Sequence, residues 1–195
     1  MVQVHRSADL RRSLIESALR LLDAEGIEAT TIRACAKASG VSHAAPAKHF
    51  ISRRVLLTEL AAQCMADLTS DVISQVAEAP ATPRDQLTAM ADAAVGYALV
   101  RPNRYRLMWR TDLLDPGDPA LQQSTSRLFG QIEAVVAKLP PSPNATRETL
   151  VIAICSAIHG YISMRIDGNF RPASDEAAPR PRQRALIDLM LGPAS

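Results

Sequence analysis

Between residues 31 and 53 the sequence gathers hydroxyl, imidazole and cationic side chains that can donate hydrogen bonds to anions. Arg33 and Lys48 carry positive charge, and Ser42 and His43 stand at the expected start of a short helix. The first N–H groups of a helix are free to bind phosphate, and a cation nearby strengthens that binding. Ordinary surface charge is the alternative, because Lys and Arg are mostly exposed in any protein. This segment is therefore a candidate phosphate-binding site.

A second pair that could do chemistry is Cys155 and His159, four residues apart and so on one face of a helix. That spacing permits metal ligation or a Cys/His catalytic pair. A tetrahedral metal site needs more ligands, however, and a nucleophilic cysteine needs an activating environment. We favour packing, with a polar bond from His159, and predict no metal, no cofactor and no enzyme.

Charge, cysteine content and the length of apolar runs add three constraints on the class of protein. The net charge of +2 is mild, but residues 1–54 hold nine Lys and Arg against five Asp and Glu, so the basic excess is N-terminal. The three cysteines are an odd number at wide spacing, which indicates neither a disulfide framework nor a zinc site. No apolar run approaches the length of a membrane span or a leader. We expect a cytoplasmic protein with no membrane association.

Helix-forming and helix-ending residues divide the first part of the chain into four expected helices. Apolar residues at helical spacing predict a helix over residues 10–25, which Gly26 ends. Thr30 or Thr31 caps a second helix through Ser39, and Gly40 ends it. Ser42 caps a third helix reaching about residue 50, and Ser52 caps a long fourth helix over residues 53–78. This order is a helix-turn-helix followed by a connecting helix.

Prolines mark the starts of most later helices, as proline favours the first helical turn. They predict helices over residues 83–100, 102–113 and 119–138, followed by a strongly apolar helix over 148–164. Residues 171–184 lack periodicity and indicate a mobile loop, before a short helix over 185–191. No strand pattern appears, so the expected fold class is all-α.

The residues of the N-terminal part also resemble a known family. Thr30-Thr31-Ile32-Arg33, Ala36, Gly40-Val41-Ser42, His49-Phe50 and Leu56-Leu57 are similar to the N-terminal domain of TetR-type repressors. The resemblance covers roughly residues 8–60. It implies a helix-turn-helix DNA-binding domain over residues 8–55 and a helical regulatory and dimerisation domain over residues 56–195.

The resemblance also implies which residues meet DNA. They lie on the second helix, on the reading helix that enters the major groove, and at the start of the connecting helix: Thr31, Arg33, Ser42, His43, Ala45, Lys48, His49 and Arg53. A bidentate contact from Arg33 to guanine would supply about 1 to 3 kcal/mol of discrimination. Arg53 at a helix start opposes the helix dipole unless a negative group such as phosphate lies before it. His49 is equally well explained as a partly buried neighbour of Phe50.

The sequence departs from the family pattern at two positions of the reading helix. Ala47 stands where many relatives carry an aromatic that packs on the DNA backbone, and Pro46 removes a backbone donor near the first turn. The stretch over residues 42–46 is nonetheless similar to one subset of the family, which carries a His-Gly pair in a late helix. His159-Gly160 fits that pair.

In the C-terminal domain the resemblance implies an inducer pocket and a homodimer through the C-terminal helices. Candidate pocket residues are Tyr105, Met108, Trp109, Cys155 and His159, although a lone Trp on an amphipathic helix is more often a core residue. We therefore expect a dimeric repressor that binds a roughly palindromic operator in double-stranded DNA and is released by a small apolar or amphipathic ligand. The alternatives are a protein of the same fold with no small-molecule inducer and, more distantly, a Cys/His enzyme.

Overall fold

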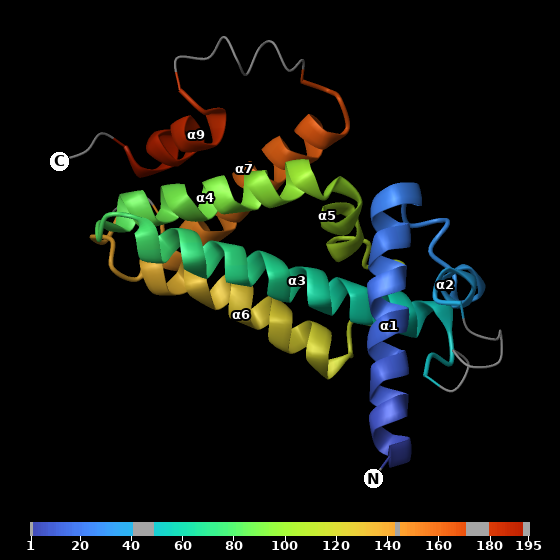
Figure 1. The fold of residues 1–195 in the computed structure, drawn as a ribbon. Helices are drawn as coiled ribbons and strands as arrows, with labels where there is room; N and C mark the ends of the chain where they lie inside the picture. Colours follow the sequence, from blue (N-terminus) through green and yellow to red (C-terminus); the bar gives the residue numbers. More distant parts are fainter. Residues whose placement is uncertain (1, 41–48, 143–144, 171–179, 193–195) are drawn as a thin grey trace. The chain divides into compact units, whose positions relative to one another are not determined.

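The computed structural model describes residues 2–40, 49–142, 145–170 and 180–192. Within these ranges every regular element is an α-helix (Figure 1). The helices are α1 (Val2–Glu25), α2 (Ile32–Ala38), α3 (Arg53–Glu78), α4 (Pro83–Val100), α5 (Pro102–Met108), α6 (Pro119–Val136), α7 (Arg147–Ile166) and α9 (Arg182–Leu191). The predicted all-α class is confirmed.

Three helices differ from their predicted extents by three residues or more. α1 begins near the N-terminus because residues 2–9 contain no Gly or Pro that would interrupt it, although apolar periodicity starts only at Leu10. α5 ends at Met108, five residues early, and is followed by turns whose backbone groups bond to α3. α9 begins at Arg182, directly after Pro181, inside the segment predicted to be a loop.

The chain forms two compact units that do not follow chain order. The first unit contains residues 1–65 and 101–124, and the second contains residues 66–100 and 125–195. α3 and α6 each contribute residues to both units. The segment around α5 thus belongs with the N-terminal helices, although some eighty residues separate it from α1 in the sequence.

The core of the first unit gathers side chains from α1, α2, the start of α3, α5 and the start of α6. Its most deeply buried members include Leu14, Leu22, Phe50, Leu57 and Leu107. Burying such side chains contributes about 1.5 to 3 kcal/mol each. This core is what holds the N-terminal helices in fixed positions.

In the second unit α4, α7 and α9 pack on one another (Figure 1). Two carboxylates fasten α9 to α4: Arg84 donates to Asp188 at 2.6 Å, and Arg184 donates to Asp92 at 2.9 Å. Gln183 also donates to Asp92, at 3.0 Å. These pairs are partly exposed, so they fix the position of α9 more than they add to the free energy of unfolding.

Among the described residues one helix, α7, is long and apolar enough to cross a membrane. Only 28% of its apolar window is buried within a single chain. A core helix of a soluble protein passes the same test of length and composition, so the finding is weak evidence for a membrane span. It does show that α7 presents apolar surface that one chain leaves uncovered.

Candidate nucleic-acid interface

The turn between α1 and α2 is built by local hydrogen bonds. Gly26 ends α1 with a φ of 83°, a conformation that favours glycine. The Thr30 hydroxyl donates to the Gly26 carbonyl at 2.9 Å, and the backbone N–H of Ala34 donates to the Thr31 hydroxyl at 3.1 Å. Thr31 is thus the N-cap of α2, one of the two caps expected. Its contact with DNA stays a prediction.

Four predicted contacts, at Ser42, His43, Ala45 and Lys48, lie outside the described residues. The flanking residues are described: Gly40 has a φ of 68° after α2, and the Ser52 hydroxyl accepts from the N–H of Val55 at the start of α3. His49 is half-buried, with its ring 6.5 Å from that of Phe50, which is a core residue. Both interpretations of His49 stay predictions.

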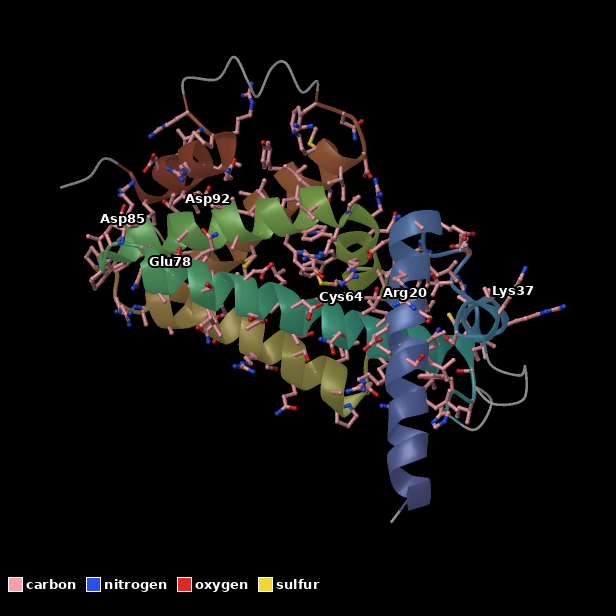
Figure 2. All side chains as sticks on the ribbon, viewed as in Figure 1. Arg20, Lys37, Cys64, Glu78, Asp85 and Asp92 are labelled. Atoms are coloured by element: carbon pink, nitrogen blue, oxygen red, sulfur yellow. The ribbon has the colours of Figure 1, made fainter. Side chains whose placement is uncertain are left out.

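Arg33 and Lys37 project from α2 into solvent (Figure 2 labels Lys37). They stand four residues apart, so they share a helix face. Within the part of the chain that the structure describes, neither forms an ion pair. Arg33 was predicted to contact DNA and Lys37 was not, although the i, i+4 spacing of the two cations is visible in the sequence.

Arg53, predicted to contact phosphate, braces the interior of the first unit. Its guanidinium donates to the carbonyl of Thr30 at 3.0 Å and to that of Ile27 at 2.6 Å, and it lies 3.5 Å from the carboxylate of Glu28. The side chain is about one-third exposed (33%). Arg53 therefore locks the α1–α2 turn onto the start of α3. A DNA contact from its remaining donors stays a prediction.

Further bonds attach the segment around α5 to the same unit. Arg104 forms a bidentate pair with Asp23 near the end of α1, at 2.8 and 2.7 Å. Arg54 donates to the carbonyls of Asp112 and Leu114, and the Thr58 hydroxyl accepts from the N–H of Asp115 at 2.9 Å. Residues far apart in sequence thereby hold α1, α3 and α5 as one body.

The five candidate pocket residues fall into both compact units. Tyr105, Met108 and Trp109 belong to the first, where the rings of Tyr105 and Trp109 lie 6.0 Å apart. Cys155 and His159 lie on α7 in the second unit. His159 is 3.4 Å from the Ser163 hydroxyl, and burial lowers its pKa. Their role in binding a ligand stays a prediction.

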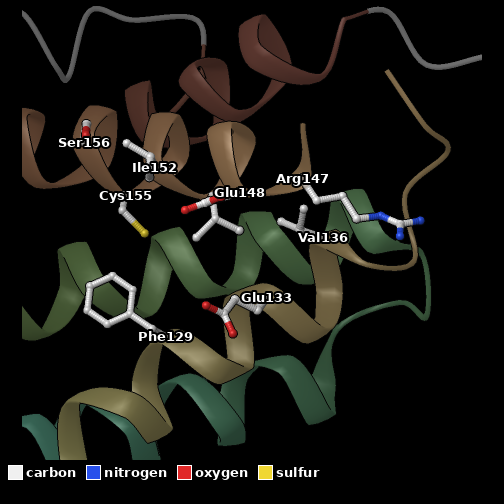
Figure 3. A pocket seen from close by; sticks show the side chains of 9 residues that line it. Phe129, Glu133, Val136, Arg147, Glu148, Ile152, Cys155 and Ser156 are labelled. Carbon is white, nitrogen blue, oxygen red and sulfur yellow. The ribbon is translucent and has the colours of Figure 1, made fainter. Parts of the chain in front are cut away.

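The second unit contains a cavity of about 530 Å³ between α6 and α7 (Figure 3). Its lining residues are Phe129, Glu133, Val136, Arg147, Glu148, Val151, Ile152, Cys155 and Ser156. Cys155 is the one predicted pocket residue among them. The others were missed because no sequence pattern links the face of α6 to that of α7. Among the described residues, no three His, Cys, Asp or Glu side chains gather as metal ligands.

Comparisons with known proteins agree with this architecture. Residues 14–60 match the family of bacterial regulatory proteins of the tetR type, and residues 87–189 match the tetracyclin repressor-like C-terminal domain. A curated relative, the HTH-type transcriptional regulator BetI of Stenotrophomonas maltophilia (strain R551-3), is 27% identical over 139 residues, which span 69% of this chain and 71% of that protein.

Two solved structures have the same fold. A protein from Rhodococcus sp. RHA1 aligns with a TM-score of 0.75 and 24% identity, covering 92% of this chain and 90% of its own. The TetR family transcriptional regulator PfmR from Thermus thermophilus aligns with a TM-score of 0.63 and 22% identity, covering 91% of this chain and 96% of its own. With both halves of the family matched, the chain belongs to the TetR family of transcriptional regulators and is a DNA-binding protein, not an enzyme.

Proposed function

We propose that this regulator is a cytoplasmic dimeric repressor that binds a roughly palindromic operator and is released by a small ligand. The observation that carries the DNA-reading part is the pair of exposed cations on α2. Arg33 and Lys37 share a face of a helix that is capped by Thr31 and braced by Arg53. Cations held on a rigid helix bind phosphate or guanine with little further ordering of the backbone.

Exposed apolar side chains on the C-terminal helices support the dimer. Met164 on α7 is 44% exposed, and Leu189 on α9 is 79% exposed. A regulator that works in water is expected to cover such surface, and a second copy of the chain offers a matching one. Two copies related by a two-fold axis carry two heads, which explains why the operator should be roughly palindromic.

Release by a ligand sets a thermodynamic condition. The ligand must bind the DNA-free arrangement more tightly than the DNA-bound one, because equal affinity for both shifts nothing. The cavity between α6 and α7 supports the presence of a ligand site in the regulatory half. Calorimetry with and without operator tests this condition, and equal ligand affinities would contradict it.

The experiment for DNA reading is fluorescence anisotropy with labelled DNA from upstream of the protein's own gene. Binding should be saturable and should weaken steeply between about 50 and 200 mM salt, because bound phosphates release counterions. Arg33→Ala and Lys48→Ala should each weaken binding, and loss of a phosphate contact should lower the salt slope by about one. Arg127→Ala is the matched control, since Arg127 is an exposed cation on α6 in the second unit.

Two outcomes would contradict the proposal for this operator. The first is an absence of specific binding, judged against a scrambled duplex of the same length. The second is equal weakening by Arg33→Ala and Arg127→Ala, which would indicate that overall charge rather than the α2 face determines affinity.

A further inference from the structure

The cavity between α6 and α7 joins an apolar wall to two carboxylates. Phe129, Val136, Val151 and Ile152 supply the apolar surface. Glu133 on α6 and Glu148 on α7 supply negative charge from two sides. In Figure 3 the Cys155 thiol and the Phe129 ring face the space between the helices.

Two exposed carboxylates line this cavity against one exposed cation, Arg147. Glu133 and Glu148 form no ion pair within the described residues. Arg147 is the one cation that lines the cavity, and in Figure 3 its side chain extends away from Cys155 and Phe129. The pKa of the Cys155 thiol is raised, first by burial and then by the negative charge of Glu133, so the carboxylate acts on the interior of the cavity.

We propose that this cavity binds a small organic cation with an apolar body, and that this cation is the regulatory ligand. The inference rests on the proposed function for its regulatory part only. An ammonium or amidinium group would lie between Glu133 and Glu148, and the apolar body would pack on the aliphatic wall. The ring of Phe129 also lines the cavity, and the faces of aromatic rings attract cations.

An apolar protein surface is a poorer occupant of the same groove. It would bury the carboxylates of Glu133 and Glu148 without a counter-charge, and burying an unpaired charge is costly. An anionic small molecule is repelled by these carboxylates, and a neutral one gains no attraction from them. Charge complementarity therefore selects a cation over the other occupants.

The test uses one carbon skeleton with three charges: 4-phenylbutylamine, 4-phenylbutanol and 4-phenylbutanoate. Isothermal calorimetry on the full chain, without DNA, should show the amine binding more tightly than the alcohol and the acid binding least. Glu133→Gln and Glu148→Gln should each weaken amine binding about fivefold, the effect of losing one partly exposed ion pair. They should leave alcohol binding unchanged. Glu78→Gln, an exposed carboxylate of α3, is the matched control.

Cys155 gives a second readout that needs no DNA. Alkylation by iodoacetamide, read residue by residue with mass spectrometry, should modify Cys155 faster than Cys35 and Cys64, which are 2% and 0% exposed. The amine should slow alkylation of Cys155 in the parent and lose that effect in Glu133→Gln. Circular dichroism of each variant verifies that it is folded.

The proposal is overturned if the three probes bind equally, or if the acid binds best. It is also overturned if the amine does not change the rate at which Cys155 is alkylated. A third contradicting outcome is faster alkylation of Cys155 when the protein is diluted without any probe, because this would show that a second copy covers the cavity. Operator release is measured separately by anisotropy. Amine binding without release of DNA would support the site and contradict the ligand-release part of the proposed function.

Discussion

Replacing Arg53 by methionine should destabilise the DNA-binding head while leaving its apolar contacts largely in place. The guanidinium donates to the Thr30 and Ile27 carbonyls at 3.0 and 2.6 Å, and methionine retains most of the aliphatic stem without these donors. A hydrogen bond from a charged group is worth about 1.5 to 3 kcal/mol. The side chain is 33% exposed, so solvent takes over part of each bond, and we expect a total loss of about 2 kcal/mol.

The assay is thermal and urea unfolding of parent, Arg53→Met, Arg53→Lys and Arg33→Met. A loss of about 2 kcal/mol corresponds to a fall in Tm of roughly 4 to 8 °C for a chain of this size. Lysine should not restore stability, because its single ammonium does not reproduce the planar arrangement of donors. Arg33→Met should unfold like the parent, since Arg33 is exposed and forms no ion pair within the described residues, yet it should weaken operator binding.

Two results would refute this reasoning about Arg53. One is a Tm for Arg53→Met within about 1 °C of the parent's, because so small a shift corresponds to well under about 1 kcal/mol for a chain of this size. The other is full recovery of stability in Arg53→Lys, which would mean that charge alone, and not hydrogen bonding to the α1–α2 turn, is what matters.

Three further perturbations have expected outcomes measurable by the same unfolding assays. Thr31→Ala removes the N-cap of α2 and should cost about 1 kcal/mol, whereas Thr31→Ser keeps the hydroxyl and should cost much less; equal losses would contradict the capping role. Gly26→Ala should lower the free energy of unfolding by about 1 to 2 kcal/mol, because alanine is strained at a φ of 83°. The added Cβ would lie 3.8 Å from Asn103, an ordinary contact, so the loss comes from the backbone and not from a clash. An unchanged Tm would show that the turn relaxes. Burial lowers the pKa of His159 below its ordinary value of about 6.5. As the pH falls, the unfolded chain therefore protonates this imidazole at a higher pH than the folded chain does. The free energy of unfolding consequently decreases as the pH falls below about 6.5. The fall in Tm between about pH 7.5 and 5.5, which brackets that ordinary value, should therefore be smaller in His159→Gln than in the parent, and an equal fall would exclude this group as the cause.

The features that the sequence predicted well depend on local interactions. Thr31 caps α2, Gly26 and Gly40 take positive φ, and Pro83, Pro102 and Pro119 begin helices as expected. Each of these preferences acts over a few neighbouring residues, so a single sequence contains the whole cause. The resemblance to the TetR family rested on the same short segment, and the family matches confirmed it.

Roles that depend on distant partners could not be predicted in the same way. The sequence predicted that Arg53 binds phosphate, because a cation at the start of a helix opposes the helix dipole and no neighbouring residue in the sequence offered a compensating negative group. Its partners at Ile27 and Thr30 lie 26 and 23 residues earlier. Asp92 and Asp188 likewise bond to side chains about ninety to one hundred residues away.

The sequence by itself determined the helical class, most of the helix ends and the family, because capping, proline geometry and apolar periodicity are encoded within one or two turns. Tertiary structure decided that the segment around α5 joins the N-terminal helices, through Arg54 and Arg104. It also brought Glu133 on α6 to the cavity that Cys155 lines on α7. Neither outcome follows from spacing along the chain, because a contact between separate helices depends on which faces are buried together, and only the folded chain fixes that.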